Sequence, residues 1–197
     1  MSRDYLLASL NSDDAVQRCD AIEELSENIS SAEVMEEILK HFDDKNFLVR
    51  CEAYDAFYGY IDKNICNELL KCLKKERSKC ARMHLCSTLC SIIKKIGCSE
   101  QERTIIHKCY SKEKELNVLL SYWCMLYLID KDKSYIGKIL EHLNNEDYHI
   151  RCNVINLLAD VEDDYVKETA KTEYCTRLMK EDCLAVRNLL EEKLEEM

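Results

Sequence analysis

The chain has 197 residues, of which 47% are hydrophobic and 34% are charged, and it carries a net charge of −10 with no proline and three glycines. The apolar fraction is enough for a sizeable core, which excludes a disordered chain, and the scarcity of turn-forming residues argues against β and α/β folds. The acidic balance disfavours nucleic-acid binding, because negative side chains repel phosphates.

The predicted elements are helices that come in pairs. Near the start, Leu6, Leu7 and Leu10 form a stripe with the spacing i, i+1, i+4, which is typical of the buried face of a short helix. A polar turn follows, and a second apolar pattern begins at Arg18. Asp and Ser in such turns are suited to capping the free amides of the next helix.

The second helix of each pair has a sequence that repeats along the chain. Residues 18–25 align with 50–57 and 82–89 at a spacing of 32 residues, and 151–158 is another clear copy. The copy between them lacks the arginine, and the last is degenerate. The copies begin at Arg18, Arg50, Arg82, Leu119, Arg151 and Arg187.

One helix pair cannot bury its apolar stripe alone, whereas stacked pairs share a continuous core. The sequence therefore predicts an all-α protein with a single domain over residues 1–197, built from about six stacked pairs. Gly97, which follows Lys94, Lys95 and Ile96, is expected to end a helix. The predicted pairs cover residues 3–28, 31–61, 64–96, 99–130, 133–160 and 162–196.

The repeat resembles the HEAT family, whose units read Leu-Leu-x-x-Leu, an acidic turn, and then Val-Arg-x-x-Ala-x-x-Ala-Leu. The best match is Phe47 to Phe57, and the next includes Ile150 and Arg151. The units are short and look most like those of HEAT proteins of the bilin-lyase type. The resemblance implies a right-handed α-solenoid of the armadillo-like class, in which the second helices line a concave face that binds a partner.

The repeat also indicates which side chains face outward on the second helices. Ala21, Ala53, Leu85 and Val154 occupy the inward position, so the residues one before and two after it should be exposed. The first outward column is Asp20, Glu52, His84, Ser121 and Asn153, and the second is Glu23, Asp55, Ser87, Cys124 and Asn156.

These columns supply the candidate binding site. Its carboxylates lie in the first two repeats and would form charge-assisted hydrogen bonds with lysine or arginine of a partner. The alternative is that they are ordinary solvated helix positions. The candidate partner-binding residues are Asp20, Glu23, Glu52, Asp55, Tyr58, His84, Ser87, Asn153 and Asn156.

No catalytic motif is recognisable, and we expect neither a cofactor nor a bound metal. The carboxylate pairs would need strong burial to act as acid and base. Cys80, His84, Cys86 and Cys90 could together hold a soft metal, but their spacing matches no recognised zinc pattern, so free buried thiols are the preferred interpretation.

The resemblance also implies a role for the arginines that open the repeats. Each is expected to reach the acidic turn of its own or a neighbouring repeat. Such pairs at the surface would contribute about 0–1 kcal/mol each. The arginines are Arg18, Arg50, Arg82 and Arg151, and the candidate acceptors are Asp13, Asp14, Asp43, Asp44 and Asp147.

A cytoplasmic location is expected, with no membrane attachment. The chain start has no apolar signal core, and the longest nearly apolar run, Val118 to Ile129, would rise only about 18 Å as a helix, short of the ~30 Å hydrocarbon layer. The 13 cysteines are odd in number and fall within helical patterns, which favours reduced thiols over a disulfide framework.

Two functional hypotheses remain open at this point. The first is a non-catalytic protein-protein interaction scaffold that binds a basic protein partner on its acidic concave face, as an inhibitor, an immunity-type protein or a regulatory adaptor would. The second is a HEAT-like enzyme, similar to a bilin lyase or, less favoured, to a DNA glycosylase, which needs a basic groove. The sequence leaves the oligomeric state open.

Overall fold

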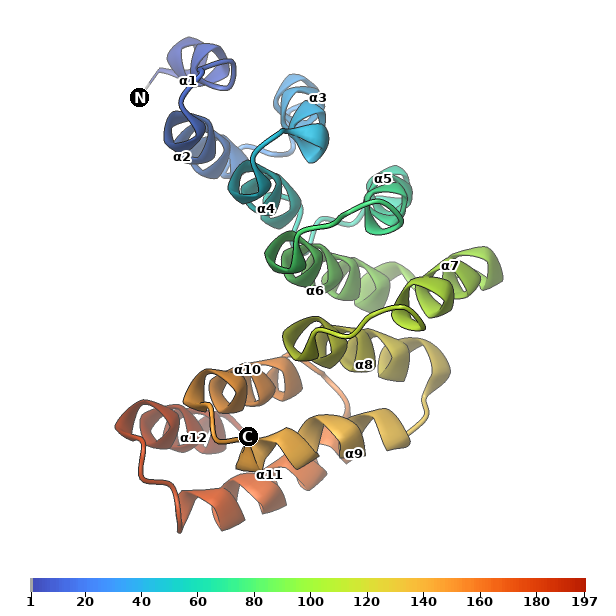
Figure 1. The fold of residues 1–197 in the computed structure, drawn as a ribbon, viewed down its shortest axis with the longest axis vertical. Coiled ribbons are helices and arrows are strands. Elements are labelled where there is room, and N and C mark those ends of the chain that lie inside the picture. Colours follow the sequence, from blue (N-terminus) through green and yellow to red (C-terminus); the bar gives the residue numbers. More distant parts are fainter. Residues whose placement is uncertain (1) are drawn as a thin grey trace. The chain divides into compact units, whose positions relative to one another are not determined.

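The computed structural model describes residues 2–197, and within them the chain forms twelve α-helices, two short 3-10 helices and no strand (Figure 1). The chain divides into two compact units, which we call unit 1 (Met1–Glu113) and unit 2 (Lys114–Met197). The prediction of an all-α fold is therefore confirmed.

Unit 1 contains three complete helix pairs and one further helix. The 3-10 helix His41–Asp43 extends the third α-helix. The helices are α1 (Arg3–Ser9), α2 (Ala15–Ser26), α3 (Ala32–Lys40), α4 (Phe47–Asp55), α5 (Lys63–Leu73), α6 (Lys79–Ile96) and α7 (Glu100–Tyr110).

Unit 2 contains two complete pairs and one preceding helix. The 3-10 helix His142–Asn144 extends α9 in the way that its counterpart extends α3. The helices are α8 (Leu116–Asp130), α9 (Ser134–Glu141), α10 (Tyr148–Ala159), α11 (Asp164–Leu178) and α12 (Leu184–Glu196).

The twelve helices agree with the prediction of about six helix pairs. The fourth range, 99–130, contains α7 of unit 1 and α8 of unit 2. A single continuous array over residues 1–197 stays a prediction.

Polar side chains in the turns define where the second helices begin. The Asp14 carboxylate accepts from the Val16 amide at 2.9 Å, and the Asn46 side chain accepts from the Leu48 amide at 2.9 Å. These caps satisfy amides that the first helical turn leaves free. At the other end of α6, Gly97 adopts a φ of +74° and donates to the Ile93 carbonyl, as the sequence predicted.

The core of unit 1 lies between the helices of each pair and between successive second helices. α2 contacts α4, and α4 contacts α6. The predicted inward residues Ala21, Ala53 and Leu85 are at most 1% exposed, and Phe57 is fully buried. Burying each large apolar side chain contributes about 1.5–3 kcal/mol. In unit 2 the corresponding Val154 is fully buried as well.

Among residues 2–197, no helix has both the length and the apolar character needed to span a bilayer. α8 is the most apolar segment, but it has 15 residues and contributes Tyr122 and Leu126 to the core.

Candidate functional site

The second helices of unit 1 carry the predicted acidic residues side by side. Asp20 and Glu23 on α2 are exposed, and Glu52 and Asp55 on the adjacent α4 are half-buried. We call these four residues the acidic face. The acidic face results from the repeat period of 32 residues, because this period places the outward positions of one second helix beside those of the next second helix.

Among these residues, Glu52 responds to the charges of the other three carboxylates. The pKa of Glu52 is raised, first by partial burial and then by the negative charges of Asp55, Glu23 and Asp20. Within the described residues, no lysine or arginine forms an ion pair with Asp20, Glu23 or Glu52. The acidic face therefore carries negative charge that these cations do not neutralise.

His84 on α6 adjoins the acidic face through Asp55. Its Nδ1 lies 2.6 Å from the Asp55 Oδ2 atom. This hydrogen bond raises the pKa of His84, although partial burial opposes the shift, and the charge of Glu52 adds to it. Ser87 is half-buried one turn further along α6. Tyr58 follows α4, is 53% exposed, and donates its amide to the Asp55 carbonyl at 2.8 Å.

The predicted site residues of unit 2 are neutral. The Asn153 side chain is half-buried and donates to the Asn117 side chain at 3.3 Å, while Asn156 is exposed. The expectation that Ser121 and Cys124 face outward is wrong, since both are 2% exposed. α8 is the most apolar helix of the chain, and most of its residues from Val118 to Tyr127 are buried.

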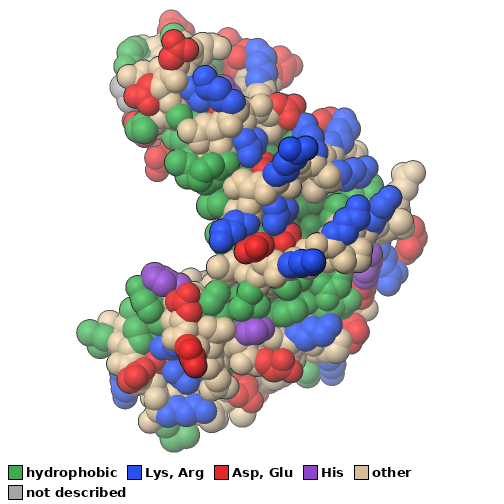
Figure 2. All heavy atoms as spheres, viewed as in Figure 1, with side chains coloured by type: hydrophobic (Ala, Val, Ile, Leu, Met, Phe, Trp, Pro, Cys, Tyr) green, Lys and Arg blue, Asp and Glu red, His purple; other side chains and the backbone are tan. Residues whose placement is uncertain are grey.

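Basic side chains gather elsewhere on unit 1. Figure 2 shows lysine and arginine side chains grouped around α5, α6 and α7. Lys63, Lys71 and Lys74 are among the exposed residues of this region. Unit 1 thus has an acidic and a basic region on different helices.

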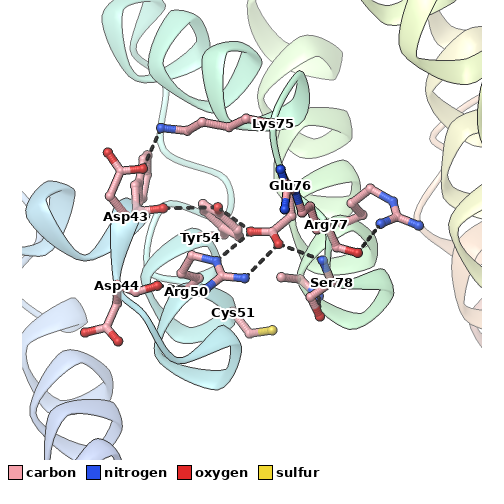
Figure 3. A network of polar contacts seen from close by, with 12 residues as sticks. Asp43, Asp44, Arg50, Cys51, Tyr54, Lys75, Glu76, Arg77 and Ser78 are labelled. Carbon is pink, nitrogen blue, oxygen red and sulfur yellow. Dashed lines mark hydrogen bonds and ion pairs between the residues drawn. The ribbon is translucent and has the colours of Figure 1, made fainter.

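The repeat arginines form a second periodic feature, which we call the arginine ladder. Arg18 donates to both Asp44 oxygens at 2.8 and 2.9 Å, and Arg50 donates to both Glu76 oxygens at 2.7 Å (Figure 3). Each arginine also donates to a carbonyl of its own turn, as Arg50 does to the Asp44 carbonyl at 2.7 Å. These two rungs of the ladder therefore join the turn of one repeat to the turn of the next.

The remaining rungs repeat this geometry. Arg82 donates to both Glu113 oxygens at 2.7 and 3.1 Å, and Arg151 to both Glu181 oxygens at 3.0 and 2.7 Å. Burial alone would raise the pKa of Glu181. Hydrogen bonds from Arg177, Arg151 and the Cys183 amide more than offset this and lower the pKa to about 2.

The ladder corrects two expectations. Of the predicted acidic residues, only Asp44 accepts an arginine through its carboxylate, while Asp13 accepts from Arg18 through its backbone carbonyl. The other carboxylate acceptors are glutamates two residues before the capping residue of the next second helix. Asp14 and Asp147 cap helices instead. The pairs are also not at the surface, since the Arg151 and Glu181 side chains are 6% and 0% exposed. Buried ion pairs are costly to break, because the remaining charge is left without a partner.

One rung is missing, and both of its members are absent together. Leu119 occupies the arginine position in α8, and Asn145 occupies the acidic position of the next turn. The Asn145 side chain still accepts from the Asp147 amide at 2.9 Å, as Asp44 accepts from the Asn46 amide. The turn geometry therefore persists where the charges do not.

The cysteines are all free, with most of them buried or half-buried. The predicted grouping of Cys86 and Cys90 with Cys80 and His84 is not what the structure contains. Cys80 and His84 instead lie beside Cys51 of α4, with one ligand atom from each within 4.8 Å of the others. Cys51 lies 29 residues before Cys80 in the sequence, so the spacing contained no motif to recognise.

Comparisons with known proteins identify the fold. No protein-family model matches the sequence, and neither does any curated protein. Among solved structures, the complex of CpcE and CpcF of phycocyanin lyase from Nostoc sp. PCC7120 is similar with a TM-score of 0.52, 10% sequence identity, and coverage of 100% of this chain and 94% of the other.

The second similar structure is the YibA protein of E. coli, with a TM-score of 0.51 and 16% identity, covering 100% of this chain and 93% of the other. The chain therefore has the fold of the HEAT-like repeat proteins over its whole length. The resemblance found in the sequence is confirmed for the fold.

Proposed function

We propose that the chain is a non-catalytic protein-protein interaction scaffold that binds a basic protein partner through the acidic face of unit 1. The observation that carries this proposal is the set of neighbouring carboxylates, Asp20, Glu23 and Glu52, that no cation of the described residues neutralises. Lysine or arginine of a partner would supply the missing charges, and hydrogen bonds to charged groups contribute about 1.5–3 kcal/mol each.

Two further observations support a protein partner. Repeat proteins of this kind present long rows of side chains at a fixed spacing, which suits them to extended protein surfaces. One of the similar solved structures is itself a complex of two chains. The free thiols fit a reducing compartment such as the cytoplasm, and an inhibitor, an immunity-type protein or a regulatory adaptor would all use such a face.

The proposal is tested by reversing charge on α2. Asp20→Lys with Glu23→Lys removes the exposed half of the acidic face and leaves Asp55 and His84 unchanged. Glu168→Lys with Glu173→Lys on α11 is the matched control, because it changes the net charge equally at other exposed positions. Helical circular dichroism of all three proteins should be the same.

Affinity capture from the native host is compared across the three proteins, and the captured protein is then titrated by calorimetry. We expect the wild type and the control to bind it, and the α2 variant to bind at least about tenfold more weakly, which corresponds to about 1.4 kcal/mol. Equal binding by the α2 variant would place the partner elsewhere. Recovery of no partner, together with turnover of a small molecule, would favour the enzyme hypothesis.

A further inference from the structure

A cluster of two thiols and an imidazole lies where α4 meets α6. The Sγ atoms of Cys51 and Cys80 are 4.0 Å apart, and a ring nitrogen of His84 lies within 4.8 Å of both. Cys80 and His84 are one helical turn apart on α6, so both project toward Cys51. Cys51 is buried, while the other two residues are half-buried, which leaves a route from solvent.

We propose that Cys51, Cys80 and His84 form a binding site for a thiophilic divalent cation, with Zn²⁺ as the best fit. Two thiolates about 2.3 Å from a tetrahedral zinc ion lie about 3.8 Å from each other. The observed sulfur separation of 4.0 Å is close to this value. Two cysteines and one histidine also leave the fourth position open for water or another ligand.

Asp55 fixes the orientation of the His84 ring through a hydrogen bond to one of its nitrogens. Its Oδ2 atom lies 2.6 Å from Nδ1 of His84. Because a carboxylate accepts hydrogen bonds, Nδ1 carries the proton of the neutral ring, and Nε2 keeps a lone pair that can bind a metal. Histidine ligands of zinc commonly donate their other ring N–H to a carboxylate in this way. Asp55 is thus a positioning residue for the site.

The surrounding charges favour a cation at this place. The Asp55 carboxylate contacts His84, and Glu52 directly follows Cys51 in the chain, so both place negative charge beside the cluster, and both belong to the acidic face. A divalent cation would compensate these charges and the two thiolates, whose protons are released to solvent on binding. A cluster that packed only for apolar contact would gain nothing from these carboxylates.

The combination of two cysteines and a histidine does not recur at the corresponding positions of the repeats that share the first cysteine. Cys51 follows the repeat arginine of its own helix, while Cys80 lies two residues before Arg82 and His84 two residues after it. The corresponding residues one repeat earlier are Cys19, Leu48 and Glu52, and those of the last two repeats are Cys152, Ala185 and Leu189. Each has the first thiol and lacks both other ligands.

Those positions provide matched controls. The fully reduced chain would be titrated with Zn²⁺ by calorimetry and with Co²⁺, whose absorption reports thiolate ligation and tetrahedral geometry. We expect a single high-affinity ion that is lost in Cys80→Ser and in His84→Ala. Cys19→Ser and Cys152→Ser, at the repeat position of Cys51, should bind as the wild type does. Circular dichroism would show that each variant remains folded.

Asp55→Asn separates the positioning role from ligation. It should weaken Zn²⁺ binding by about 10- to 100-fold while the Co²⁺ complex keeps its thiolate bands. A reduced wild-type protein that binds neither ion would overturn the site, and so would binding that survives both Cys80→Ser and His84→Ala. The site does not depend on the proposed partner, since Asp20→Lys with Glu23→Lys leaves all three ligands in place.

Discussion

The arginine ladder and the acidic face are both built from carboxylates at repeating positions, but they differ in what faces those carboxylates. Asp44, Glu76 and Glu181 each receive a guanidinium from the preceding repeat. Asp20 and Glu23 receive none among the described residues and remain exposed. The chain thus neutralises one set of acids internally and leaves the other available to another molecule.

The difference also appears in the pKa values. Burial alone would raise the pKa of Glu76, but hydrogen bonds from Arg50 and the Ser78 amide lower it. The pKa of Glu52 is raised by partial burial and by its acidic neighbours. Ionisation of Glu76 therefore stabilises the fold, whereas ionisation of Glu52 opposes it. The same substitution, glutamate to glutamine, should have opposite effects in the two regions.

The largest effect is expected on the ladder at Glu181. Glu181→Gln leaves the buried Arg151 and the half-buried Arg177 without their carboxylate, and breaking a buried pair in this way costs about 3–5 kcal/mol. Urea unfolding at neutral pH measures the loss. Glu68→Gln is the control, because Glu68 pairs with Lys71 at the surface and its removal should cost at most about 1 kcal/mol. Equal losses would show that the ladder is no more than a surface feature.

The next effect is a loss of stability in acid. The folded pKa of Glu181 is about 2, compared with an ordinary value of 4.5. A carboxylate with a depressed pKa contributes its full stability above the unfolded value, and the contribution is lost as pH falls through the folded value. The wild type should therefore lose stability between about pH 4.5 and pH 2 more steeply than Glu181→Gln, as measured by urea unfolding at successive pH values. Parallel curves would contradict the assignment.

The sequence predicted the helix pairs well because their determinants are local. The apolar stripe at Leu6, Leu7 and Leu10 and the capping Asp14 each act within one or two turns of the chain. Repetition of the same pattern at 32 residues then implied stacking. The buried Ala53 and Leu85 followed directly from that alignment.

The partners across repeats were harder to predict, since they depend on the register between stacked helices. The sequence does not single out Glu76 as the acceptor of Arg50, because aspartates nearer to Arg50 in the chain carry the same charge. Its signal was its place two residues before the cap at Ser78, which Asp44 shares with respect to Asn46. Cys51 and Cys80 are 29 residues apart, and only superposition of the repeats brings them together.

The smallest effect is expected on the acidic face, where its sign is what matters. Glu23→Gln removes one of several neighbouring negative charges, and glutamine has nearly the same helix propensity as glutamate. Like charges at this spacing destabilise a helix by about 0.2–0.5 kcal/mol, so the substitution should leave the free energy of unfolding unchanged or raise it by that amount. Urea unfolding at low salt, where screening is weakest, gives the best resolution. A loss of about 1 kcal/mol or more would mean that Glu23 already has a stabilising partner within the chain, and that the contrast with the ladder is wrong.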